Sequence, residues 1–138
     1  MSVTEPVVCE LINSTAFNRL DGINQYGIVR YIHKSKIPYT RYTHSLGVFA
    51  LLRKYGASTE EQIAGLLHDA SHTVFSHVGD YLIKEKNMLI DQTKDAYQDE
   101  KHLWILSQTD VADILAKYNM SLKSIDHKCG CFEMLEKD

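Results

Sequence analysis

Apolar residues recur along the chain with a spacing that is mostly helical. Pro6 suits the first turn of a helix that carries the apolar residues Val7, Val8, Leu11 and Ile12. A second short helix should follow and end near Gly22. Residues 26–42 are less regular and contain Pro38, so we expect a loop there, with a short extended piece.

The middle of the chain predicts two consecutive helices. The first should run from Thr43 to Lys54, with Gly56 as its C-terminal stop. Ser58 followed by Glu61 has the pattern of a capping box, in which each side chain accepts the backbone N–H of the other residue. This box opens a helix that leads towards His68.

The remaining pattern is also helical. We expect helices over residues 78–86, 98–107 and 109–118, and a last short helix that begins at Ser121. Thr109 should cap the helix over 109–118, and Asn119 should end it. The pattern therefore predicts an all-α helical bundle.

Composition and charge narrow the class of protein. A chain of 138 residues with 44% hydrophobic content can form one domain, residues 1–138, with a real core. The formal charge of −3 gives no basic field for nucleic acid. No segment approaches the roughly 20 apolar residues that cross a membrane, and residues 1–11 lack a signal-peptide pattern. We expect a cytoplasmic protein; a homo-oligomer stays open, because no feature identifies an interface.

The three cysteines do not predict a disulfide framework. An odd count in a chain of this size is typical of reduced thiols in the cytosol. Cys129 and Cys131 lie near His127, so a metal clip is an alternative, but no second cysteine pair accompanies them. Free thiols are therefore expected.

Four of the seven histidines fall between His44 and His77. The two predicted helices, if antiparallel across the short turn at residues 56–58, bring His44 close to His68 and Asp69. Imidazole and carboxylate groups suit divalent first-row metals. A single histidine at a helix end is more often a cap or a satisfied core residue. Four in one window, with an acidic neighbour after an apolar run, favour a metal site, because burying such charges without compensation is costly.

Several stretches of this chain resemble the HD superfamily of metal-dependent phosphohydrolases. The matching residues are RYTHSLGV at 41–48, AGLLHD at 64–69, His72 and FSH at 75–77. The likeness is closest to the dNTP triphosphohydrolase-like branch, which NRL at 18–20, with Ile23 and Gln25, also resembles. It covers residues from about 5 to 118 and implies an HD-domain helical bundle.

The resemblance implies that His44, His68 and Asp69 are metal ligands and that Arg41 contacts phosphate oxygens. Family members use Fe, Mn, Mg, Zn or Ni, and the sequence does not select one of them. The planar fork of an arginine suits bidentate contact with a phosphate. The alternative for Arg41 is an ordinary surface arginine. The implied substrate is a small phosphate ester such as a nucleotide.

By the same resemblance, His72 lines the catalytic centre, and His77 with Asp80 forms a pair in which the carboxylate charges an imidazole that faces the phosphate. The alternative is that Asp80 caps a helix while His77 packs under Phe75. Gln25 matches a sugar-contacting position, although a glutamine in a loop needs no special explanation.

His102 is displaced from the family pattern. The branch usually carries a His-Glu pair three positions earlier, where this chain has Asp99 and Glu100. Either His102 takes over from the next helical turn or that group is missing. On an amphipathic helix with Leu103, Trp104 and Leu106, an exposed histidine is the expected reading.

Two departures from the family pattern bear on activity. Ser71 stands where relatives usually have glycine, and a positive φ there would strain it. The family's fourth ligand, an aspartate in a later helix, has no counterpart in a matching run, so we expect a domain that lacks the C-terminal part. Such a chain is either an active hydrolase or a catalytically impaired HD-fold module that binds nucleotide, metal or a protein partner.

Overall fold

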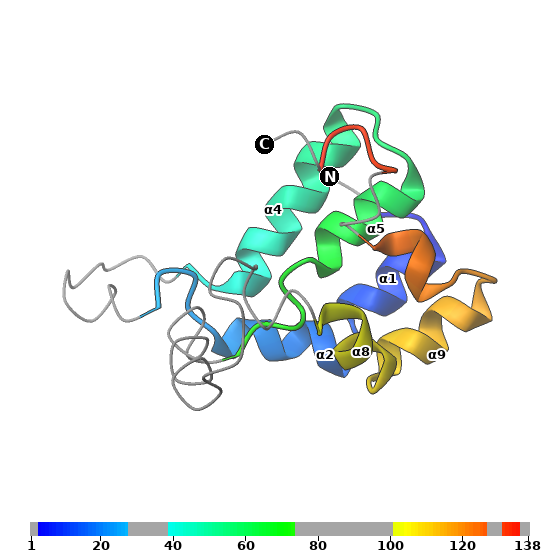
Figure 1. The fold of residues 1–138 in the computed structure, drawn as a ribbon. Coiled ribbons are helices and arrows are strands. Elements are labelled where there is room, and N and C mark those ends of the chain that lie inside the picture. Colours follow the sequence, from blue (N-terminus) through cyan, green and yellow to red (C-terminus); the bar gives the residue numbers. More distant parts are fainter. Residues whose placement is uncertain (1–2, 28–38, 74–100, 127–130, 136–138) are drawn as a thin grey trace, which may run out of the picture.

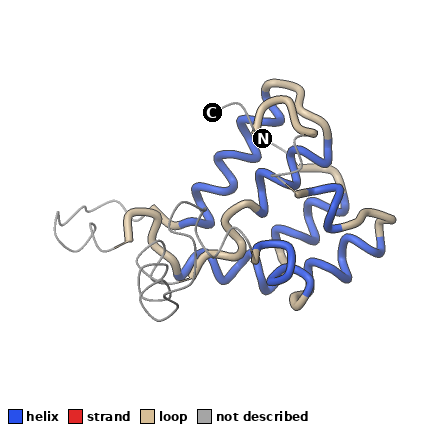
Figure 2. The backbone as a smooth tube through the Cα atoms, viewed as in Figure 1, coloured by secondary structure: helices blue, strands red, loops and turns tan. Residues whose placement is uncertain are grey.

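The computed structural model describes residues 3–27, 39–73, 101–126 and 131–135, and the part of the chain that it describes is helical (Figure 1). Figure 2 shows helices joined by loops in these ranges, with no strand. The elements are α1 (Pro6–Ile12), α2 (Thr15–Asn18), the 3-10 helix η1 (Arg19–Gly22), α4 (Arg41–Lys54), α5 (Thr59–Leu67), α8 (His102–Ser107), α9 (Asp110–Lys117) and the 3-10 helix η2 (Leu122–Ile125). The all-α prediction is confirmed.

The predicted helix ends agree with the structure in most places. Gly56 follows α4 with φ of 80°, and Asn119 follows α9 with φ of 57°. Both are left-handed conformations that end a helix. The helix predicted from Thr43 begins two residues earlier, at Arg41, because the Thr40 hydroxyl caps it by accepting the Thr43 N–H at 3.2 Å. The extended piece expected before it is a single antiparallel bridge between Asn24 and Thr40.

Two predictions about helix caps are corrected by the structure. Thr109 occupies the N-cap position of α9, but its hydroxyl donates backwards to the Leu106 carbonyl instead of capping. The capping box before α5 is only half formed. Ser58 accepts the Glu61 N–H at 3.2 Å, while the buried Glu61 carboxylate accepts N–H groups from Met134 and Leu135 at 2.6 and 3.1 Å.

The two cysteines among the described residues differ in oxidation state. Cys9 carries a free thiol, whereas Cys131 is in a disulfide, so the expectation of free thiols is wrong for Cys131. The helix predicted over 78–86 lies outside the described residues, as do residues 98–100 at the start of the helix predicted over 98–107. Among the helices that are described, none has the length and apolar character to cross a membrane.

A single apolar core joins the helices. Its largest fully buried side chains include Phe17 of α2, Phe49 of α4, Leu66 and Leu67 of α5, and Leu106 and Leu115 of α8 and α9. Helices α4 and α5 pack side by side as an antiparallel pair (Figure 1).

Gly65 on α5 permits this close packing. A Cβ at position 65 would overlap Leu52 Cδ1 and lie 3.1 Å from Val48 Cγ1, both on α4. The absence of a side chain at Gly65 therefore sets how near the two helices approach, and with it the distance between the groups at their adjoining ends.

Candidate metal centre

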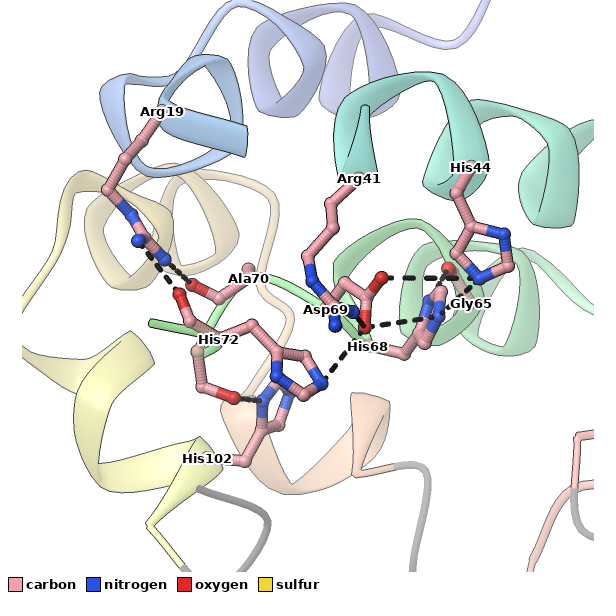
Figure 3. A network of polar contacts seen from close by, with 10 residues as sticks. Arg19, Arg41, His44, Gly65, His68, Asp69, Ala70, His72 and His102 are labelled. Carbon is pink, nitrogen blue, oxygen red and sulfur yellow. Dashed lines mark hydrogen bonds and ion pairs between the residues drawn. The ribbon is translucent and has the colours of Figure 1, made fainter. Parts of the chain in front are cut away.

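His44 lies in the first turn of α4, and His68 and Asp69 lie directly after the last residue of α5. The antiparallel arrangement brings the start of α4 to the end of α5, as the sequence predicted. The Nε2 atoms of His44 and His68 are 3.3 Å apart (Figure 3). The three residues together offer ligand atoms that all lie within 4.8 Å of one another.

The backbone of α5 fixes the orientation of His68. Its Nδ1 lies 2.7 Å from the Gly65 carbonyl oxygen. Because a carbonyl only accepts, Nδ1 carries the proton, and in the neutral ring Nε2 then presents a lone pair towards His44. A histidine held in this way by a backbone carbonyl is the usual arrangement of an imidazole that binds a metal.

Asp69 is buried, and its two carboxylate oxygens have different surroundings. Oδ1 contacts Arg41 Nη1 at 2.8 Å, His72 Nε2 at 3.2 Å and His68 Nε2 at 3.6 Å. Oδ2 lies 4.0 Å from His44 Nε2 and has no hydrogen-bond partner among the residues that the structure describes. A buried carboxylate oxygen without a partner is costly, so a cation is the natural group to satisfy it.

These distances fit a single divalent ion. Ligands about 2.0–2.2 Å from a metal in tetrahedral or octahedral geometry lie roughly 3.0–3.6 Å from one another. The Nε2 atoms of His44 and His68, 3.3 Å apart, fall in that range; Asp69 lies 3.6 Å from His68 Nε2 through Oδ1 and 4.0 Å from His44 Nε2 through Oδ2. His44, His68 and Asp69 could therefore hold one ion with only small movements of the side chains.

The protonation states suit metal binding. Burial and the nearby positive charges of His68 and Arg41 lower the pKa of His44, partly opposed by Asp69, so its ring is neutral near neutral pH. Burial alone would raise the pKa of Asp69, but the hydrogen bond from His72 and the charges of His68 and Arg41 lower it well below its usual range. The centre thus offers a neutral His44 imidazole and an ionised carboxylate.

Arg41 is buried in this structure rather than lying at the surface. Its guanidinium pairs with Asp69 at 2.8 Å from the first residue of α4 (Figure 3). The alternative reading of an ordinary surface arginine is therefore wrong. The positive charge of Arg41 stands within the centre, next to one of the proposed ligands.

His72 lies in the short segment after α5, where the chain continues as a turn through Ser71 instead of as a helix. The His72 N–H donates to the Asp69 carbonyl at 3.0 Å, and its Nε2 contacts the Asp69 carboxylate. Ser71 has a negative φ, so a serine there brings no left-handed strain. The concern about its replacing glycine is removed.

His102 is only 3% exposed, so the expectation of an exposed histidine is wrong. Its Nδ1 lies 2.8 Å from the Ser71 hydroxyl. His102 and Leu106, four residues apart on α8, share the buried face, while Trp104 is 63% exposed. The two positions that depart from the family pattern, Ser71 and His102, thus contact each other.

Sequence reasoning assigned no role to Arg19, which donates to two carbonyls of the same turn. Its Nη1 and Nη2 bind the carbonyl oxygens of His72 and Ala70 at 2.9 and 2.6 Å (Figure 3). No local pattern predicts this contact, because Arg19 lies 53 residues before His72. The only sequence signal for Arg19 was its position in the NRL stretch at 18–20, which resembles the family.

A pocket of about 600 Å³ opens beside this turn, and His72 separates it from Asp69. Helices α2, η1, α8 and α9 contribute the other walls. The lining residues are Thr15, Ala16, Arg19, Ala70, Ser71, His72, Thr73, Ile105, Gln108, Thr109 and Asp110.

Of the remaining predicted site residues, Gln25 lies next to Tyr39, and His77 and Asp80 fall outside the described residues. Gln25 is partly buried, its N–H donates to the Tyr39 carbonyl at 2.9 Å, and its side-chain oxygen has no partner in the described ranges. His77 and Asp80 fall in residues 74–100, which the structure does not describe.

The chain is similar to known proteins along most of its length. The HD domain model matches residues 41–128. The chain is 36% identical over 126 residues to a protein named metal-dependent phosphohydrolase cns2 from Cordyceps militaris, covering 91% of this chain and 34% of that protein. It is 42% identical over 131 residues to the uncharacterized protein YdhJ of Bacillus subtilis, covering 95% and 38%. The chain thus spans slightly more than a third of the length of these relatives.

Proposed function

Since this chain belongs to the HD-domain family, we propose that it is a metal-dependent phosphohydrolase that acts on a nucleotide or a related phosphate ester. The observation that carries the proposal is Asp69 Oδ2. It is buried without a partner among the described residues and lies 4.0 Å from His44 Nε2, which is itself 3.3 Å from His68 Nε2. The name of the Cordyceps relative supports the same reaction class.

His44, His68 and Asp69 would hold the ion. A divalent ion in such a site supplies Lewis acidity to a phosphoryl oxygen and lowers the pKa of a bound water. The ligands are nitrogen and oxygen atoms, which suits Fe, Mn, Mg, Zn or Ni and does not single out one of them.

The residues around the ligands have separate proposed roles. Arg41 holds Asp69 by its ion pair and offers its charge to phosphate oxygens entering the centre. His72 hydrogen-bonds Asp69, keeps the carboxylate oriented and lines the reacting site. Its imidazole is close enough to that site to exchange a proton with substrate.

The roles of three further residues, His77, Asp80 and Gln25, rest on the family resemblance alone. His77 with Asp80 would assist the leaving oxygen, and Gln25 would contact the sugar of a nucleotide. His102 was the weaker candidate for contact with substrate; its bond to Ser71 favours a role in supporting the turn that carries His72. The assignment to the dNTP triphosphohydrolase-like branch belongs with these proposals.

The first test is elemental analysis of the chain purified without added metal, repeated on His68→Ala. Near-stoichiometric transition metal in the parent, lost in His68→Ala, is the expected result. No metal in either protein would contradict the proposal.

The second test is a screen of phosphate esters, with nucleoside triphosphates included. Asp69→Ala should abolish turnover, while Asp113→Ala, an exposed carboxylate on α9, should leave it unchanged. Bound metal without turnover of any ester would favour the alternative, a catalytically impaired HD-fold module.

A further inference from the structure

We propose that Arg19 is a positioning residue of the metal centre, which it serves by holding the backbone of the turn that joins Asp69 to His72. The inference rests on the metal site proposed above. Among the described residues, the hydrogen bonds of Arg19 go to backbone carbonyls and not to the side chains of the three ligands.

Arg19 binds two carbonyls that lie beyond the end of α5. Helix α5 ends at Leu67, so the carbonyls of the following turn have no N–H group of a continuing helix to accept. The guanidinium binds two of them, those of Ala70 and His72, at 2.6 and 2.9 Å (Figure 3). A positive charge is also favourable at the C-terminal end of a helix.

The two hydrogen bonds from Arg19 hold the residues on either side of Ser71. Asp69 directly precedes Ala70, and the His72 ring meets the Asp69 carboxylate at 3.2 Å. Fixing the two carbonyls therefore fixes the backbone between a proposed ligand and the imidazole that orients it. Removing a residue that holds a metal ligand in place typically weakens metal affinity 10–100-fold.

The shape of the guanidinium matters as much as its charge. Two different nitrogens of Arg19 reach two different carbonyls, a geometry that the single nitrogen of a lysine does not reproduce. Arg19 is exposed to solvent, and it lines the pocket of about 600 Å³. A small molecule entering that pocket can therefore reach the space that the guanidinium occupies.

The test uses the full chain and compares Arg19→Ala with Arg53→Ala. Arg53 makes an ion pair with Glu5 at 2.8 Å, and it lies nine residues beyond His44 on α4, about 14 Å along the helix. Titration with Mn²⁺, followed by calorimetry and by the Mn²⁺ electron spin resonance signal, should show affinity about 10–100-fold weaker in Arg19→Ala. Arg53→Ala should bind as the parent does.

Chemical rescue separates positioning from general loss of structure. Ethylguanidine supplied in solution should restore most of the Mn²⁺ affinity of Arg19→Ala, whereas ethylammonium should not. Neither compound should alter Arg53→Ala. Arg19→Lys, which keeps the charge and the aliphatic stem, covers the case in which the alanine variant fails to fold, and it should also bind Mn²⁺ at least about tenfold more weakly.

The outcomes separate this inference from the proposed function. A parent that binds Mn²⁺ while Arg19→Ala or Arg19→Lys binds it equally well overturns the positioning role and leaves the metal site standing. A weakened Arg19→Ala that ethylguanidine does not restore also overturns it. A parent that binds no metal overturns both proposals.

Discussion

The three ligands and the turn that follows them are built in different ways. His44, His68 and Asp69 are placed by two consecutive helices, and the His44–His68 contact spans 24 residues. The turn is held by side chains from distant elements, Arg19 of η1 across 53 residues and His102 of α8 across 31. The ligands thus depend on the geometry of one helical hairpin, whereas the turn depends on the whole domain being assembled.

The largest effect on stability should come from removing the charge of Asp69, which is a proposed ligand and also contacts His72 of the turn. Asp69→Asn keeps the shape of the side chain but removes the carboxylate that pairs with the buried Arg41 at 2.8 Å. The free energy of unfolding of the metal-free chain should fall by about 3–5 kcal/mol, and metal binding should be lost.

Urea denaturation with a chelator present measures that free energy. Glu10→Gln is the control, because it breaks the exposed pair with Lys117 and should cost no more than about 1 kcal/mol. Equal losses in the two variants would mean that the buried pair is not special.

Gly65→Ala tests the ligand hairpin itself. The added methyl group would overlap Leu52, so the side chain must move or α5 must shift away from α4. The expected cost is about 1–3 kcal/mol of stability, with weaker metal binding because His44 and His68 move apart.

Gly47→Ala supplies the matched control for that substitution. A Cβ at position 47 meets nothing within 4 Å, and alanine favours a helix over glycine by about 0.5–1 kcal/mol. Thermal unfolding should therefore show opposite signs for the two variants. A stabilised Gly65→Ala would contradict the role given to the close packing.

Ser71→Ala weakens the turn and leaves the hairpin intact. His102 loses its hydrogen bond to the serine hydroxyl, at an expected cost of about 0.5–1.5 kcal/mol. Ser107→Ala removes an exposed hydroxyl bonded to the Trp104 carbonyl and should cost less. Denaturation of both variants measures the difference, and equal costs would show that the Ser71 contact adds nothing.

The smallest expected effect is a pH dependence. The pKa of His44 lies below its ordinary value of 6.5, because burial and neighbouring positive charges oppose protonation in the folded chain. The unfolded chain takes up the proton first as pH falls below 6.5, so stability is constant above that value and declines below it. His44→Gln should flatten the decline in urea denaturation of the metal-free chain between about pH 7 and 5.

Asp69 acts in a separate and more acidic window. Its pKa is lowered, so the stability it contributes is present above its ordinary value of 3.8 and is lost as pH falls through the lower folded value. A decline above pH 5 that persists unchanged in His44→Gln would exclude His44 as its source.

The sequence predicted what short-range patterns encode. The helical spacing, the stops at Gly56 and Asn119 and the meeting of His44 with His68 all follow from residues close together in the chain. Glycine at position 65 was part of the family motif, but its packing against Leu52 required the structure.

What the sequence did not predict depends on long-range packing. The burial of His102 was missed because neighbouring Leu103 and Trp104 suggested a different face, whereas Leu106 four residues later marks the buried one. The hydrogen bonds from Arg19 to Ala70 and from the Met134 N–H to Glu61 join segments far apart in the chain, and no local pattern predicts such contacts. Three-dimensional packing decides them.

The helical hairpin of α4 and α5 also bears on the order of folding. Residues 44–69 contain all three proposed ligands, whereas Glu61 must wait for Met134, 73 residues later, before its carboxylate is satisfied. Contacts of short sequence separation form fast, and distant ones wait for large loops to close. The ligand set can therefore assemble before the C-terminal segment docks, and an ion captured at that stage would add its binding free energy to the folding of everything that follows.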